Sequence, residues 1–299
     1  MQIPNQSAVE NLDLLAKQVV EGFLIGLHKS PFHGFSVEFA EHRPYNQGDN
    51  LKYVDWKVYG RNDKMFVKKF EEETNLRACI AIDTSASMYY PENGGTKLQY
   101  SCVAAACLFY LLKKQLDAGS LGLFDTGVYK LTRAKTGTVH YRSLVNELQM
   151  VLQSPKGDTR TDAPKAIHQL AERLHHRSLV ALFSDMPETE QEGEDLVAAL
   201  QHLKYKKHEV IVFHVVDGKH ELNFEFDNRP YEFVDMETGQ TLKMNPADMK
   251  AAYIDRMNNY RNRLNGNCRQ LGIDMITCDL NEPVEQVLYR YLLKRNKMM

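Results

Sequence analysis

Short apolar runs alternate with longer amphipathic segments along most of the chain. Residues 78–82 form the first such run, which consists of small and β-branched side chains. A run of this kind is typical of a strand buried on both faces of a parallel sheet covered by helices. Further strands are predicted at residues 121–124, 128–131, 178–183, 209–216 and 274–278. Strands that alternate with helices predict an α/β fold with a mostly parallel sheet wound on both faces.

Two segments refine this expected sheet. The strands 121–124 and 128–131 are joined by Asp125-Thr126-Gly127, a hairpin signal that predicts one antiparallel edge strand. Residues 223–242 alternate like a second hairpin. Helices are predicted at 97–116, 141–152, 195–203, 249–271 and 283–293, and a further helix starts near residues 161–164.

The chain before residue 76 has a different character from the rest. Residues 7–28 are predicted to form an amphipathic helix, because leucine, valine and phenylalanine recur every three or four residues. Turn residues and aromatics then mix through residues 29–61, around the single tryptophan, Trp56, which we expect to be buried. We therefore divide the chain into an N-terminal extension, 1–75, and an α/β domain, 76–299. The sequence leaves open whether the extension folds independently or packs on the sheet.

Bulk composition narrows the function classes. The chain has 299 residues, 25% of them charged, and a formal net charge of −2, which gives no global attraction to nucleic acid or to an anionic membrane. It contains no signal-peptide pattern and no run of about 18 apolar residues, so no membrane span is expected. The five cysteines form no C-x-x-C pair, which favours buried thiols in a reducing compartment. These features predict a cytoplasmic protein.

The candidate chemistry begins where the first apolar run ends. Asp83, Ser85 and Ser87 follow that strand at every second position. Ligands of open α/β sheets bind outside the carboxyl ends of the strands. One carboxylate and two hydroxyls that converge there suit a hard cation such as Mg²⁺ or Mn²⁺. Alternatively, Asp83 and Ser85 only cap the following turn.

Two further oxygen donors lie at comparable positions. Asp185 follows the strand 178–183, and Thr161 precedes a helix start. Thr159 competes with Thr161 for this role, and we favour Thr161 because it stands directly at the helix start. The predicted metal ligands are thus Asp83, Ser85, Ser87, Thr161 and Asp185. Two carboxylates would also neutralise the charge of a divalent ion.

This D-x-S-x-S loop, followed by Thr161 and Ser184-Asp185, resembles the metal-ion-dependent adhesion site of von Willebrand factor A (vWA) domains. Two upstream segments, R-x-Y-x-x-G-D at residues 43–49 and V-D-W at 54–56, together with F-V-D-M-E-T-G at 233–239, are similar to a narrower bacterial family called domain of unknown function fifty-eight. The resemblance runs from about residue 34 to the C-terminus. It implies a three-layer α/β/α sheet with the metal at its rim.

The same resemblance implies a partner. Many members of the family are paired with MoxR-type AAA+ ATPases, and the resemblance implies an adaptor or assembly factor that works with such an ATPase and with a client protein complex. This chain departs from the pattern in two places. Many members carry membrane segments ahead of the matched region, where this chain has only the amphipathic helix, and Lys52 stands where the pattern has an arginine.

Three function classes follow from these observations. The first is a non-catalytic, metal-dependent protein-binding module that leaves a coordination position for an acidic side chain of a partner. The second is a phosphatase-type hydrolase that uses Asp83, but Ser85 replaces the second acid that such an enzyme needs two residues later. The third is a scaffold whose metal is incidental. The sequence favours the first and predicts no enzyme.

Overall fold

The computed structural model describes residues 11–27, 42–44, 60, 66–68, 76–91, 95–154, 162–186, 190–236 and 239–296. Within these ranges the chain forms two compact units, one containing Pro31–Asn75 and the other Met1–Ser30 with Leu76–Met299. In the smaller unit, β1 (His42–Pro44) pairs antiparallel with β2 (Phe66–Lys68). The predicted burial of Trp56 falls outside the described residues.

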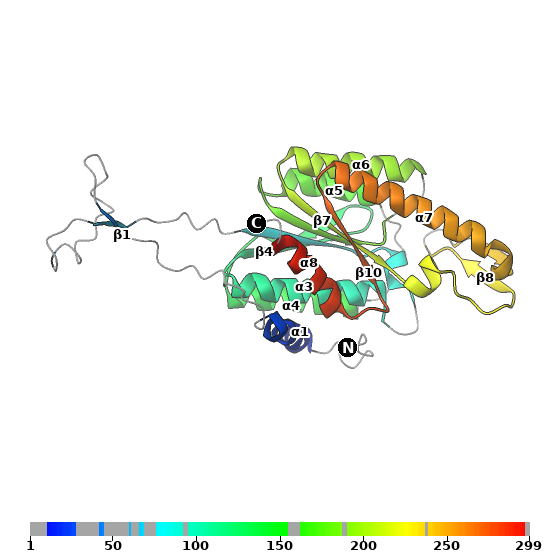
Figure 1. Ribbon diagram of the computed structural model, residues 1–299, viewed down its shortest axis with the longest axis horizontal. Helices are drawn as coiled ribbons and strands as arrows, with labels where there is room; N and C mark the ends of the chain where they lie inside the picture. The colour runs from blue at the N-terminus through cyan, green and yellow to red at the C-terminus, as the bar shows by residue number, and fades with distance from the viewer. Residues whose placement is uncertain are drawn as a thin grey trace. The chain divides into compact units, whose positions relative to one another are not determined.

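The larger unit is organised around a six-stranded sheet with the order β10-β7-β6-β3-β4-β5 (Figure 1). All neighbouring strands are parallel except β4 and β5, so the predicted antiparallel edge strand is confirmed. The α/β fold is confirmed with it. The strands are β3 (Arg77–Asp83), β4 (Ala118–Phe124), β5 (Val128–Leu131), β6 (Leu179–Ser184), β7 (Glu209–Val216) and β10 (Asp274–Asp279).

Helices cover both faces of this sheet. Helices α5, α6 and α7 lie on one face, and α3, α4 and α8 lie on the other (Figure 1). Apolar side chains of β6 and β7, including Val180, Leu182 and Val212, pack with Ile167 and Leu200 in the core under the first group. The bounds are α3 (Lys97–Lys114), α4 (Thr138–Gln153), α5 (Ala163–Arg173), α6 (Glu190–Tyr205), α7 (Pro246–Gln270) and α8 (Val284–Asn296).

Helix α1 (Leu12–Leu27) packs on the helices rather than on the sheet, below α3 and α4 in Figure 1. Leu12 and Val20 are fully buried there. Hydroxyl groups also hold the helix, since Tyr141 donates to Asp13 at 2.7 Å and Tyr110 donates to Glu21 at 3.0 Å. The structure therefore groups α1 with the sheet domain, which differs from the sequence-based division at residue 75. Periodicity alone does not indicate which surface an apolar stripe covers.

The carboxyl ends of β3, β6 and β7 continue into the segments that form the candidate site. Strand β3 leads into a 3₁₀ helix, η3 (Ala86–Tyr89), and β7 leads into a single π-helical turn, η4 (Gly218–Leu222). The turn needs glycine at 218, because a Cβ there would lie 2.0 Å from an Asp279 carboxylate oxygen. The predicted hairpin then follows as β8 (Tyr231–Val234) and β9 (Thr241–Met244), whereas the π-helical turn was not predicted.

The structure also bears on two features that the composition raised, the cysteines and the apolar helices. The five cysteines are all buried free thiols, as expected. No helix in the described part of the chain is both long enough and apolar enough to cross a lipid bilayer.

Candidate functional site

Asp83 is the last residue of β3, and its side chain is fully buried. The backbone NH of Ser85 donates to one carboxylate oxygen at 3.0 Å, and the Ser184 hydroxyl donates to the other at 2.7 Å. The first contact is the turn cap that the alternative interpretation predicts. The second links β3 to the end of the neighbouring strand β6, so Asp83 also joins two segments that are far apart in sequence.

The pKa of Asp83 is raised from its ordinary 3.8 to about 6. Burial is the larger cause, because it removes the water that stabilises a carboxylate, and the charge of Asp185 adds to it. Hydrogen bonds from Ser85 and Ser184 favour the ionised form but do not fully offset these effects. At neutral pH the site therefore holds an ionised carboxylate in surroundings that disfavour it.

Ser85 and Ser87 place two hydroxyl groups beside this carboxylate. Their Oγ atoms lie 3.1 Å apart. Ser85 is the residue before η3, yet its side chain makes no capping hydrogen bond to that helix. Its hydroxyl is therefore not used in the way that serines at helix starts commonly are.

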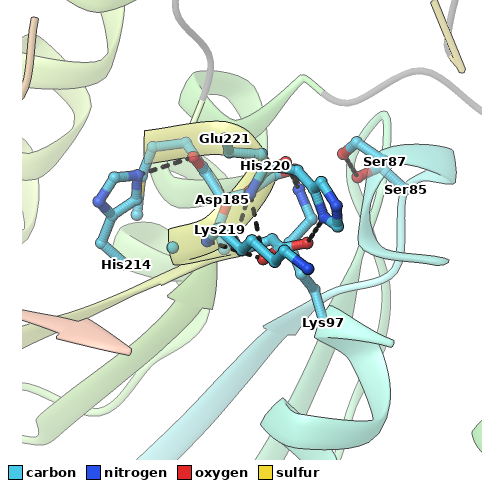
Figure 2. Close-up of polar contacts among 12 residues, drawn as sticks. Ser85, Ser87, Lys97, Asp185, His214, Lys219, His220 and Glu221 are labelled. Atoms are coloured by element: carbon cyan, nitrogen blue, oxygen red, sulfur yellow. Dashed lines mark hydrogen bonds and ion pairs between the residues drawn. The ribbon is translucent and has the colours of Figure 1, made fainter. Parts of the chain in front are cut away.

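Asp185 directly follows β6, and its side chain forms an ion pair that the sequence analysis did not foresee. The Lys97 ammonium lies 2.7 Å from an Asp185 carboxylate oxygen and 2.6 Å from a Glu221 carboxylate oxygen. Figure 2 shows Lys97 extending from the start of α3 to the two acids, with Ser85 and Ser87 on the adjacent loop. The ammonium thus bridges the end of β6 and the η4 turn.

Lys97 is only 2% exposed. Burial alone would lower the pKa of its amine, but the charges of Asp185 and Glu221 outweigh that effect and raise the pKa above its ordinary value. Lys97 therefore remains a cation inside the protein. Its neighbours supply the compensation that a buried charge requires.

The backbone of Asp185 is also held in place. The His214 ring donates from Nε2 to its carbonyl oxygen at 3.0 Å, since a carbonyl can only accept. Burial lowers the pKa of His214 to about 4, so the ring is neutral. The next residue, Met186, has a left-handed φ of 54° and donates its backbone NH to the Ser184 hydroxyl. Such strained backbone often accompanies a functional turn.

We next asked whether these groups suit the divalent cation that the sequence predicts. A Mg²⁺–oxygen distance of about 2.1 Å places two adjacent octahedral ligands about 3.0 Å apart. The Ser85 and Ser87 oxygens, which form a hydrogen bond with each other, lie 3.1 Å apart and so are compatible with this separation. Asp83 adds a buried carboxylate whose charge a cation would balance. The donors are hard oxygens, and they fit Mg²⁺ or Mn²⁺ rather than a softer metal.

Two predicted ligands stand apart from this set. Asp185 lies close enough to Asp83 to raise its pKa, but it is paired with Lys97. Thr161 and its rival Thr159 lie outside the described residues. Among the residues that the structure describes, three or more histidine, cysteine, aspartate or glutamate side chains nowhere gather as a metal cluster. Among the described residues, the serine hydroxyls therefore stand beside Asp83 as the other candidate oxygen ligands.

The sequence analysis missed Lys97, Glu221 and His214. Lys97 carried a usable signal, because it is the first residue of α3, after the Thr96 N-cap. A cation is disfavoured at a helix N-terminus. A lysine there, directly before a helix predicted to be buried, indicates that acids elsewhere must compensate it. Glu221 and His214 offered no comparable signal.

Comparisons with known proteins find a matching family and several relatives. The model of a family described as "Protein of unknown function DUF58" matches residues 41–263. Uncharacterized proteins of Mycobacterium tuberculosis (strain ATCC 25618 / H37Rv) and Mycobacterium bovis (strain ATCC BAA-935 / AF2122/97) are 27% identical over 217 residues, which cover 71% of this chain. The aligned region spans 65% of the length of those relatives.

Two examples come from the solved structures that are similar to this chain. The conserved hypothetical protein BatB from Bacteroides thetaiotaomicron has a TM-score of 0.46 and 16% identity, over 74% of this chain and 99% of that one. The SpRpn10 VWA domain has a TM-score of 0.37 and 12% identity, over 72% of this chain and 94% of that one.

Proposed function

This chain belongs to the DUF58 family and has an α/β fold built on a mostly parallel six-stranded sheet, and we propose that it is a non-catalytic protein-binding module that depends on a divalent cation. Asp83, Ser85 and Ser87 would hold Mg²⁺ or Mn²⁺. Asp185 and Thr161 are the further ligands that the motif resemblance implies.

The observation that carries the proposal is the state of Asp83. Its carboxylate is fully buried and its pKa is raised, first by burial and then by Asp185. Two serine hydroxyls at ligand spacing lie on the loop that follows it. A buried charge that is disfavoured by its surroundings is a common feature of functional sites.

The chain's own residues would shape what binds. The bound ion would supply a positive centre that an acidic side chain of a partner can approach. Ser184 and the Ser85 backbone NH orient the Asp83 carboxylate, and the rigid end of β3 fixes its position. The site would therefore be preorganised, which reduces the entropic cost of capturing a partner.

The proposal includes a protein partner for this site. We propose a MoxR-type AAA+ ATPase, together with a client protein complex, because the resemblance of the motifs implies it. Purified ATPase provides the test. We expect capture by the wild-type chain in Mg²⁺ and loss of capture by Asp83→Asn in the same buffer. We compare the variant with the wild type rather than removing Mg²⁺ with a chelator, because a chelator would also disable the ATPase. Equal capture of the ATPase by both chains would refute carboxylate bridging.

We propose binding rather than catalysis because the loop lacks a second acid. The position two residues after Asp83 is Ser85, whose hydroxyl cannot act as the general acid of a phosphatase-type reaction. The alternative, a metal-dependent hydrolase that uses Asp83, predicts turnover of a phosphate ester. Release of phosphate from p-nitrophenyl phosphate by the wild type but not by Asp83→Asn would favour that alternative.

The cation itself can be tested directly. An ion that binds only the folded state stabilises it by about 2.7 kcal/mol at 100 times its dissociation constant. We expect Mg²⁺ and Mn²⁺ to raise the melting temperature of the wild type and to leave that of Asp83→Asn unchanged. Equal melting temperatures of the wild type with saturating ion and with EDTA would contradict a metal site.

A further inference from the structure

The buried lysine beside the candidate site calls for an explanation of its own. Lys97 comes from the start of α3, Asp185 from the end of β6 and Glu221 from the η4 turn after β7. The ammonium lies at hydrogen-bond distance from both acids, 2.7 and 2.6 Å. The Tyr90 ring, whose centroid is 5.9 Å from the ammonium, adds a further favourable contact for a cation.

Among the residues that the structure describes, several acids gather around this lysine. Asp185 and Glu221 contact its ammonium directly, and the charge of Asp185 also acts on Asp83. A divalent ion that binds beside Asp83 would therefore lie near the same acids that hold the ammonium.

We propose that Lys97 is a built-in counter-cation that sets how strongly this rim binds a divalent ion, because it holds the Asp185 carboxylate that the ion would otherwise use. This inference rests on the proposed function. Lys97 is a positioning residue: its ammonium contacts Asp185 and Glu221, and it would act on a bound ion through them. It opposes the ion in two ways, by occupying Asp185 and by like-charge repulsion.

The same contact connects the site to the η4 turn. One carboxylate oxygen of Glu221 accepts a hydrogen bond from the Lys97 ammonium, and the other accepts one from the backbone NH of Asp217 at 2.7 Å. His220 of the same turn packs edge-on against Tyr90, which follows η3. The turn therefore contacts both the lysine and the loop that carries Ser85 and Ser87. Glu221 competes with Asp185 for one ammonium, so its charge should also affect the ion.

The first test replaces the lysine. Lys97→Met removes the charge and keeps an unbranched side chain that is one atom shorter, and Lys97→Arg keeps the charge. We expect Lys97→Met to bind Mg²⁺ more tightly than the wild type, on the order of tenfold, and Lys97→Arg to stay close to the wild type. Titration calorimetry and the dependence of the melting temperature on Mg²⁺ concentration give the affinities.

The second test uses a milder change in case Lys97→Met does not fold. Glu221→Gln removes an acid that is 26% exposed and leaves the ammonium to Asp185 alone. We expect this variant to bind Mg²⁺ several-fold more weakly than the wild type. The two variants thus shift affinity in opposite directions, which a general loss of structure would not do.

The outcomes separate this inference from the proposed function. Equal dissociation constants for the wild type, Lys97→Met and Glu221→Gln would overturn the role of Lys97 and leave the metal site intact. Binding of Mg²⁺ by Lys97→Met but not by the wild type would refute the proposed function and support the proposed role of Lys97. The ammonium would then take the place of the ion in the wild-type protein. Absence of binding in all three chains would overturn both.

Discussion

The regions at the two ends of the parallel strands carry charged side chains in very different surroundings. At the carboxyl end, Asp83 and Lys97 are almost completely buried and are held by hydrogen bonds and ion pairs. At the amino end, the loops before β6 and β7 carry His176, Arg177 and Lys207, all of them exposed. The first end gathers buried groups of both signs of charge, whereas these side chains at the second end, together with Glu209 at the start of β7, are exposed.

The difference shows that burial, rather than the number of charges, marks the candidate site. An exposed cation keeps its water and contributes little to stability. A buried charge loses its water, so the fold must supply partners for it. The partners of a buried charge come from distant parts of the sequence, so the sequence alone does not reveal the buried network. Three substitutions test this contrast.

The largest effect on stability is expected when Lys97 is replaced by methionine at the buried end, and the same replacement at the exposed end serves as the control. Lys97→Met leaves Asp185 and Glu221 without their shared cation, so we expect a loss of about 3–5 kcal/mol in the free energy of unfolding. The matched control, Lys207→Met, should change it by less than about 0.5 kcal/mol. Urea titrations of both variants without divalent ions provide the measurement. Equal losses would mean that burial does not distinguish the two ends.

An intermediate effect of opposite sign is expected at Asp83. Its raised pKa means that the native state holds the proton more tightly than the unfolded state does. The resulting stabilisation is complete below the ordinary pKa of 3.8 and is lost as the pH rises through about 6. Without metal, Asp83→Asn should therefore be more stable than the wild type by about 1–3 kcal/mol above pH 6.

This advantage should shrink as the pH falls toward 4, because the wild-type carboxyl is then protonated in the native state. Asp227→Asn serves as the control, since the Asp227 side chain is 82% exposed. The stability difference between each variant and the wild type, measured from pH 4 to 8, decides the matter. A difference at Asp83 that does not vary with pH would refute the assigned cause of the shift.

The smallest effect is expected at Ser184, which donates to Asp83 and accepts from the Met186 backbone. Ser184→Ala removes both contacts inside the protein, so we expect a loss of about 1 kcal/mol. Ser154→Ala is the control, because that exposed hydroxyl bonds only to the last turn of α4. Thermal unfolding of the pair suffices, and similar melting temperatures would show that the Asp83–Ser184 contact is energetically unimportant.

The order of elements followed from the sequence because their patterns are local. Strand β3 and helix α3 lie within two residues of their predicted bounds, and the hairpin through Asp125 forms the antiparallel edge. The same was true of the loop with Asp83, Ser85 and Ser87, since a polar run after a buried strand is visible in one dimension. The π-helical turn η4 was not predicted, because the sequence shows no residue pattern that specifies such a turn.

By itself, the sequence determined the α/β fold, the parallel sheet and the acid-and-hydroxyl loop at the end of its first strand. Tertiary structure alone decided which charges meet there. Lys97 lies 88 residues before Asp185 and 124 residues before Glu221, and nothing in periodicity links such distant positions. Likewise, α1 packs on α3 only because the folded chain offers it an apolar surface. Charge pairing and burial depend on three-dimensional proximity, which local pattern does not contain.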